Sequence, residues 1–118
     1  MAVVKLNLSG HTNEYLDQME FVFPGVLHVD LADPELTVKL TNFLAPLMGS
    51  GDQVVVALPG LSPLAALVLT IIHGLTGSFP VIQTLIRSDS GFIPGPQVDL
   101  QTLRNDIARA SRKDIIIL

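Results

Sequence analysis

The sequence contains no cysteine and no tryptophan, and its aromatic residues are five phenylalanines and one tyrosine. Without cysteine the chain cannot form disulfides, thiolate nucleophiles, zinc–cysteine sites or iron–sulfur clusters. A cysteine-free chain also fits a reducing compartment. The first residues, MAVVKLNLSG, lack the basic region, apolar run and cleavage site of a signal peptide. We therefore expect a cytoplasmic protein.

Long hydrophobic runs are also missing, although 48% of the residues are hydrophobic and the mean hydropathy is +0.51. The longest run, residues 64–72, is far shorter than the roughly 20 residues of a membrane-spanning helix. This apolar content excludes a disordered chain, and 118 residues suit a single domain over 1–118. So much apolar surface further predicts a homo-oligomer.

Basic residues are scarce, with 7 Lys and Arg against 11 Asp and Glu and a formal net charge of −4. Long nucleic acids are bound by basic stripes, and the sequence has none. We therefore expect any anionic ligand to be small. Backbone N–H groups at helix N-termini would have to hold it.

The order of hydrophobic patterns predicts alternating strands and helices. We expect strands over residues 2–8, 26–31, 53–58 and 81–86, and helices over 15–22, 36–47, 64–73 and 100–107, with a loop over 88–96. Asp99 caps the last helix, which turns Leu100, Leu103 and Ile107 inward, and 115–118 forms a strand or a tail. The alternation predicts a small three-layer α/β domain with a mostly parallel sheet of four to five strands.

Right-handed crossovers place the first and third strands side by side, so the ligand crevice lies beyond their carboxyl ends. Two loops meet there, and each opens a helix; Ser62 would be the N-cap of the second helix. The candidate ligand-binding residues are Ser9, Gly10, His11, Thr12 and Asn13 in the first loop, Pro59, Gly60, Leu61 and Ser62 in the second, and Arg87 after the fourth strand. They form either a phosphate cradle or ordinary turns with a solvated arginine.

His11 is the one candidate catalytic residue in these loops. It can act as a general acid or base, donate to a phosphate or accept a phosphoryl group, or it is an exposed loop histidine. Serine catalysis through Ser62 is disfavoured because the sequence has no G-x-S-x-G elbow. His11, His28 and His73 lack the spacing of metal ligands, so we expect no metal and no cofactor.

Three segments carry a resemblance to a known family: VVKLNLSG, LPGLSPLAALVLTIIHGLTGSFP and VDLQTLRNDIAR. Over residues 3–112 the chain resembles the small CRISPR-associated proteins of the Csx-fifteen family. The resemblance implies a Rossmann-like fold and a role in type III CRISPR antiviral defence, which signals through cyclic oligoadenylate. It implies that the chain binds this second messenger, most simply cyclic tetra-adenylate, and sequesters it. A homodimer would match the symmetry of the ring, and Tyr15 or aliphatic side chains would contact the adenines.

Three other functions stay open. The chain could cleave the ring as a metal-independent ring nuclease, with His11 as the acid or base. It could be a phosphocarrier in which His11 accepts phosphate from a protein partner. It could also be a structural subunit that associates through the apolar helix over residues 64–73.

Overall fold

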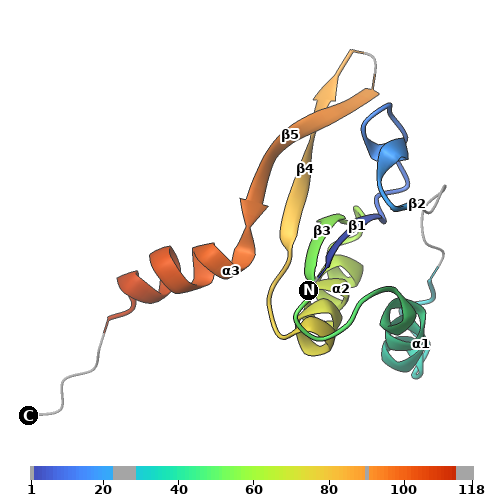
Figure 1. Ribbon diagram of the computed structural model, residues 1–118. Coiled ribbons are helices and arrows are strands. Elements are labelled where there is room, and N and C mark those ends of the chain that lie inside the picture. Colours follow the sequence, from blue (N-terminus) through green and yellow to red (C-terminus); the bar gives the residue numbers. More distant parts are fainter. Residues whose placement is uncertain (1, 23–28, 90, 114–118) are drawn as a thin grey trace, which may run out of the picture.

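The computed structural model describes residues 2–22, 29–89 and 91–113, and its centre is one open, mostly parallel sheet (Figure 1). The strands are β1 (Val3–Asn7), β2 (Phe21–Val22), β3 (Gln53–Ala57), β4 (Val81–Ser88) and β5 (Gly91–Asp99). Their order in the sheet is β2-β1-β3-β4-β5. The pairs β1–β2, β1–β3 and β3–β4 are parallel, and β4–β5 is antiparallel. The predicted α/β class with a mostly parallel sheet is confirmed.

The first and third strands are neighbours, as predicted. β1 and β3 pair in parallel from Val3 with Gln53 to Asn7 with Ala57. Four consecutive β3 residues, from Val54 to Ala57, are buried, which is typical of a parallel strand covered on both faces. The carboxyl ends of β1 and β3 therefore open side by side at one edge of the sheet.

One face of the sheet is covered by α1 (Leu36–Leu44), continued by the 3-10 turn η2 (Ala45–Leu47), and by α2 (Ser62–Thr76). The core on this face consists of side chains that alternate along β1 and β3 and recur at helical spacing in the helices: Val4, Leu6, Leu8, Val54, Val56, Leu36, Leu40, Leu44, Leu64, Val68 and Ile72. Each of these side chains contributes about 1.5–3 kcal/mol when fully buried. Gly77 ends α2 with φ 91°, a left-handed conformation that glycine adopts without strain.

The opposite face carries only the 3-10 turn η1 (Leu16–Gln18) among the described elements, and there Leu16 and Met19 pack on Val55, Ala57 and Val81. The predicted three-layer arrangement is therefore not confirmed, because no described helix covers this face. The predicted helix over 15–22 is wrong. The chain becomes extended at Met19 (φ −65°, ψ 150°), and residues 21 and 22 pair with β1 instead.

The predicted strand over 26–31 is not confirmed. Residues 26–28 lie outside the described part of the chain, and residues 29–31 are not in a strand. The Asp30 side chain accepts a hydrogen bond from the Ala32 N–H, and the Asp30 carbonyl accepts one from the Asp33 N–H. Such local bonds favour a turn over a strand.

The predicted loop over 88–96 is wrong, because β4 and β5 form a long antiparallel hairpin. Pro94 and Pro96 are compatible with β5 because it is an edge strand, where a missing N–H leaves no neighbour unpaired. The register shifts between Gln83 and Leu85, and the Gln83 amide donates to the Thr84 and Gly95 carbonyls there. Glycine and proline therefore mark a bulge and an edge in this hairpin.

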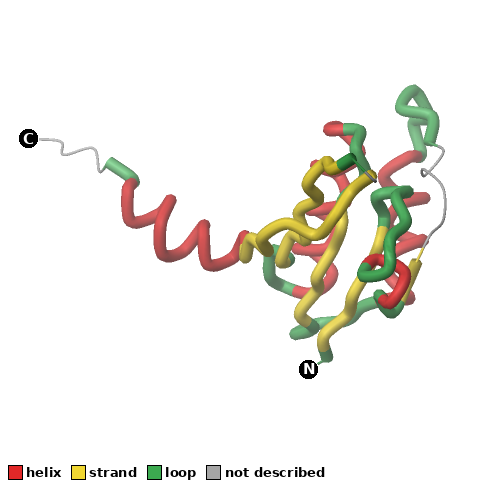
Figure 2. The backbone as a smooth tube through the Cα atoms, turned by 90° about the horizontal axis from the view of Figure 1, so that it is seen from above, coloured by secondary structure: helices red, strands yellow, loops and turns green. Residues whose placement is uncertain are grey.

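A helical run follows β5, made of α3 (Leu100–Thr102), the π-helix η3 (Leu103–Ala108) and the 3-10 turn η4 (Arg109–Ser111). We call residues 100–111 the terminal helix. The predicted cap is confirmed, since the Thr102 N–H donates to Asp99 Oδ1 over 3.1 Å. The predicted inward face is wrong, because Leu103 and Ile107 are 40% and 60% exposed. The helix projects away from the sheet in both views (Figures 1 and 2).

The C-terminal residues and a membrane-spanning helix are the subject of two further predictions. The predicted strand or tail over 115–118 lies outside the described residues. Among the residues that the structure describes, no helix has the length and hydropathy needed to cross a membrane.

Candidate functional site

The loop after β1 is shaped by Asn7, a buried polar residue at the end of that strand. Asn7 is 1% exposed. Its Nδ2 donates to the His11 carbonyl (2.9 Å), and its Oδ1 accepts from the N–H and Oγ of Ser9 (3.1 and 2.6 Å). The His11 N–H in turn donates to Ser9 Oγ over 3.1 Å. Together with Gly10 at φ 77°, these bonds fold the loop into a tight bend that leaves His11 exposed.

His11 lies against an aromatic ring from the other half of the chain. Its imidazole and the Phe92 ring have centroids 4.1 Å apart and planes tilted by 34°. Asn13 links the loop after β1 to β5, since its Nδ2 donates a hydrogen bond to the Phe92 carbonyl over 2.9 Å. Its Oδ1 accepts from the Leu16 N–H over 2.7 Å and so starts η1. The β4–β5 hairpin is thus tied to the first predicted loop.

The second predicted loop leads into α2. Pro59 is buried, whereas Gly60 and Leu61 are exposed. Leu61 is the N-cap, and no side chain caps the helix; the predicted N-cap role of Ser62 is wrong, because Ser62 is already the first helical residue. Pro63 provides no N–H, so the N–H groups of the remaining first-turn residues point out at this end of the helix.

A cavity of about 400 Å³ lies between the two loops and the hairpin. β4 continues past the end of β3, so its middle residues form one wall. His11 and Gly60, one from each predicted loop, line this cavity. The remaining lining residues are not among the predicted ones: Leu58, Ile82, Gln83, Thr84, Leu85 and Phe92. We call this space the His11 cavity. Its volume is in the usual range of small-molecule sites, and its lining is mostly apolar.

Arg87 is the cation that the sheet register brings to this site. It is the direct cross-strand partner of Phe92 and is exposed. Directly opposed residues of an antiparallel pair point to the same face of the sheet. Arg87 therefore lies beside the ring that contacts His11, although it is part of β4 and does not follow the strand as predicted.

The predicted residues thus divide by role. His11 and Gly60 line the cavity, while Ser9 and Asn13 make internal hydrogen bonds that build the loop. Thr12 is exposed beside His11. Tyr15 lines a separate hollow of about 410 Å³ with Glu14 and Pro94. Phe92 was missed because its position depends on a hairpin in a segment whose glycines and prolines predicted a loop.

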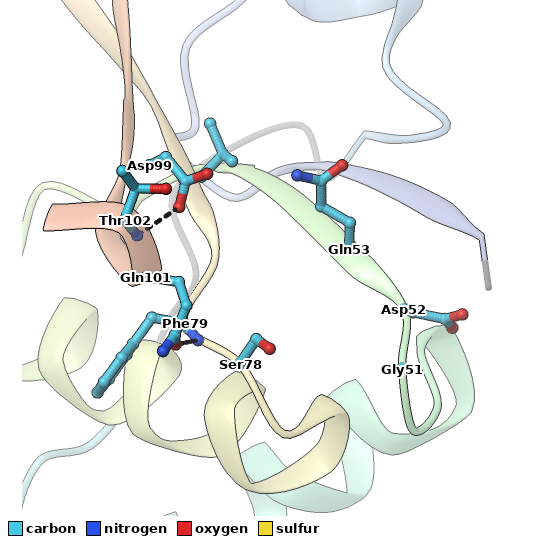
Figure 3. Close-up of a pocket in the computed structure, with 9 residues that line it drawn as sticks. Gly51, Asp52, Gln53, Ser78, Phe79, Asp99, Gln101 and Thr102 are labelled. Carbon is cyan, nitrogen blue, oxygen red and sulfur yellow. Dashed lines mark hydrogen bonds between the residues drawn. The ribbon is translucent and has the colours of Figure 1, made fainter. Parts of the chain in front are cut away.

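A second cavity of about 310 Å³ lies at the opposite edge of the sheet, at the base of the terminal helix (Figure 3). Asp52 and Asp99 line it, and Gln101 Oε1 accepts a hydrogen bond from the Phe79 N–H there. No lysine or arginine lines this cavity among the described residues. With two carboxylates and no cation it is poorly suited to a phosphate.

The other histidines lie elsewhere. His73, in the last turn of α2, contacts the Phe79 ring with centroids 4.3 Å apart and planes tilted by 42°. His28 lies outside the described residues. In the described ranges, no three histidine, aspartate or glutamate side chains are grouped so that they could bind a metal ion.

Comparisons with protein-family models, with curated proteins and with solved structures find no match to this chain.

Proposed function

We propose that the chain binds cyclic tetra-adenylate in the His11 cavity and sequesters it from the effectors of type III CRISPR defence. The ligand class comes from the resemblance of three sequence segments to the Csx-fifteen family. The His11–Phe92 ring pair at the mouth of an apolar cavity is the structural observation that carries the proposal. In this account the protein is a cytoplasmic, Rossmann-like homodimer.

The chemistry of the cavity suits one nucleotide unit of such a ring. A purine can stack on the exposed parts of the two rings, a contact worth about 1–3 kcal/mol per base. The open N-terminus of α2, next to Gly60, offers N–H groups and a positive dipole to a phosphate. Arg87 adds one positive charge on the same face as Phe92. Two copies would present these groups twice to a ring with two-fold symmetry.

Sequestration is preferred to cleavage because His11 has little catalytic support. Metal-independent cleavage requires a ribose 2′-OH in line with its phosphate and a group that stabilises the developing charge. Among the described residues, His11 is the one titratable side chain that lines the cavity, so no second acid or base there can share the proton transfers with it. Cleavage with His11 as the base is the alternative function, since the imidazole is exposed and its orientation is limited by Phe92.

Gly60→Asp tests the site with little risk to the fold. Gly60 is exposed, a Cβ added there would have no atom within 4 Å, and its backbone does not require a left-handed conformation. The substitution places a carboxylate where the phosphate is expected. We expect titration calorimetry with cyclic tetra-adenylate to show at least about tenfold weaker binding, since one repulsive contact of about 1.4 kcal/mol suffices. Ser50→Asp, in an exposed turn at the other end of the sheet, is the matched control. Equal affinity of the two variants would contradict the site.

His11→Ala separates the remaining functions. It should abolish cleavage if His11 is the base, and it should abolish a phosphoramidate if the protein is a phosphocarrier. Sequestration should only weaken, because Phe92 and the α2 N-terminus stay in place. Chromatography of the ligand and phosphohistidine-specific detection on the protein distinguish the three outcomes.

A further inference from the structure

The terminal helix carries apolar side chains that nothing in the described chain covers. Leu103 and Ile107 are 40% and 60% exposed, and all residues from Thr102 to Lys113 are exposed. Leu100, Leu103 and Ile107 are spaced to share one side of the helix. A helix of this length gains little stability in water unless an apolar face is buried. The helix therefore lacks a docking partner within the described part of its own chain.

The β4–β5 hairpin carries a matching exposed apolar strip. Ile82 pairs with Val98 and Ile86 with Ile93 across the two strands. Ile82 and Ile86 lie four apart on β4 and share a face, and each paired residue lies on the same face as its partner; the register shift accommodates the odd spacing of Ile93 and Val98 on β5. We call these four side chains the apolar ladder. Ile86, Ile93 and Val98 are 47%, 44% and 38% exposed. A 12-residue helix is about 18 Å long, and the eight residues of β4 span about 26 Å, so the ladder is long enough to receive it.

The charges of the two parts are opposite. Residues 100–113 hold four basic side chains and one acidic, whereas residues 1–99 hold three basic and nine acidic. The terminal helix is therefore attracted to the body of another copy, while two bodies alone repel each other. The edge of β5 is a poor alternative contact, because Pro94 and Pro96 interrupt its N–H groups.

We propose that the terminal helix of one copy docks on the apolar ladder of a second copy, and that the exchange is reciprocal. The helix projects from the base of β5, away from the sheet (Figures 1 and 2), so a second chain covers the ladder. In a dimer with two-fold symmetry, both helices and both ladders are buried at once. This interface concerns the self-association named in the proposed function but requires no nucleotide.

Sedimentation equilibrium without nucleotide tests the proposal. The wild type should be a dimer, and Leu103→Asp with Ile107→Asp should raise its dissociation constant at least about 100-fold, because two apolar contacts are lost. Thr37→Asp with Val38→Asp, on the exposed side of α1, is the matched control and should stay dimeric. A monomeric wild type, or a dimer that survives the Leu103 and Ile107 substitutions, would overturn the proposal.

Cross-linking identifies the contact itself, since the natural chain has no cysteine. A mixture of the single variants Ile107→Cys and Ile93→Cys should form a mixed disulfide under mild oxidation, and Ile107→Cys with Val38→Cys should not. The double variant Ile93→Cys with Ile107→Cys should run as a cross-linked dimer. A cross-linked monomer would show that the helix folds back on its own hairpin and would overturn the exchange. Gly60→Asp reports on the His11 cavity and should leave the dimer intact, whereas the Leu103 and Ile107 substitutions report on the dimer, so the two proposals can fail independently.

Discussion

The imidazole of His11 and the ring of Phe92 lie with their centroids 4.1 Å apart, although one belongs to the loop after the first strand and the other to the last strand. This contact brings the hairpin over the carboxyl ends of β1 and β3. The loop after β1, the loop before α2 and the hairpin together then line one cavity. The proposed ligand site depends on this pair more than on any single loop residue.

Phe92→Ala should weaken the binding of cyclic tetra-adenylate by about 10- to 100-fold, because it removes the stacking surface. Phe79→Ala is a matched control, since Phe79 makes the same kind of contact with His73 at the opposite edge of the sheet. Titration calorimetry of the two variants gives the comparison. Equal losses of affinity would mean that the effect comes from general destabilisation.

Asn7→Ala should lower the free energy of unfolding by about 2–3 kcal/mol, because it removes three hydrogen bonds, two of them to the buried Ser9. The first loop should loosen at the same time, with weaker ligand binding. Urea unfolding measures the stability, and Asn42→Ala, exposed on α1, should change it by less than about 0.5 kcal/mol. A cost below about 1 kcal/mol for Asn7→Ala would show that the loop does not depend on this side chain.

Two glycine substitutions should act in opposite directions. At Gly95 an added Cβ would lie 2.6 Å from Thr84 Oγ1 and 2.9 Å from Ile86 Cγ1, so Gly95→Ala should cost about 1–3 kcal/mol. At Gly74, inside α2, nothing lies within 4 Å, and Gly74→Ala should stabilise the protein by about 0.5–1 kcal/mol. Thermal unfolding measures the change in stability of each variant. A change of the same sign in both variants would contradict the close packing assigned to the bulge.

Asp52 should make stability depend on pH in the acid range. The N–H groups of Ala2 (3.0 Å) and Gly49 (2.8 Å) donate to its carboxylate and lower its pKa below the ordinary value of 3.8. The stabilisation is therefore fully present at a pH well above 3.8 and is lost as the pH falls through the lower pKa of the folded state. The difference in stability between wild type and Asp52→Asn should be constant from about pH 7 to 5 and shrink toward about pH 3. A difference that stays constant over this whole range would refute this role.

The sequence predicted the parts of the fold that follow from hydrophobic periodicity. The residues of β3 form a short β-branched run, and Leu36, Leu40 and Leu44 recur at helical spacing, so both elements lie where expected. The hairpin was missed because Pro94, Gly95 and Pro96 are typical of loops, and only pairing with β4 makes β5 a strand. The helical spacing of Tyr15, Leu16 and Met19 was also misleading, since tertiary contacts bury Leu16 and Met19 from a single 3-10 turn.

Only part of the candidate site could be predicted from the sequence. The adjacency of β1 and β3 follows from crossover rules, and these rules bring His11 and Gly60 to one edge. Phe92 and the middle of β4 complete the cavity through contacts between distant segments, which periodicity does not encode. Asn7 is unusual for a central strand, but the sequence leaves open whether it lines the ligand site, an interface or solvent; its role depends on the bonds it makes to Ser9 and His11 in the folded loop.

Ultrafiltration of the purified protein in excess over cyclic tetra-adenylate, followed by chromatography of the retained ligand after denaturation, tests the central claim most directly. We predict that the ring is retained intact, and that retention falls in Phe92→Ala but not in Phe79→Ala. Retention of linear product would replace sequestration by cleavage. Passage of the ring through the membrane, neither retained nor cut, would contradict the account.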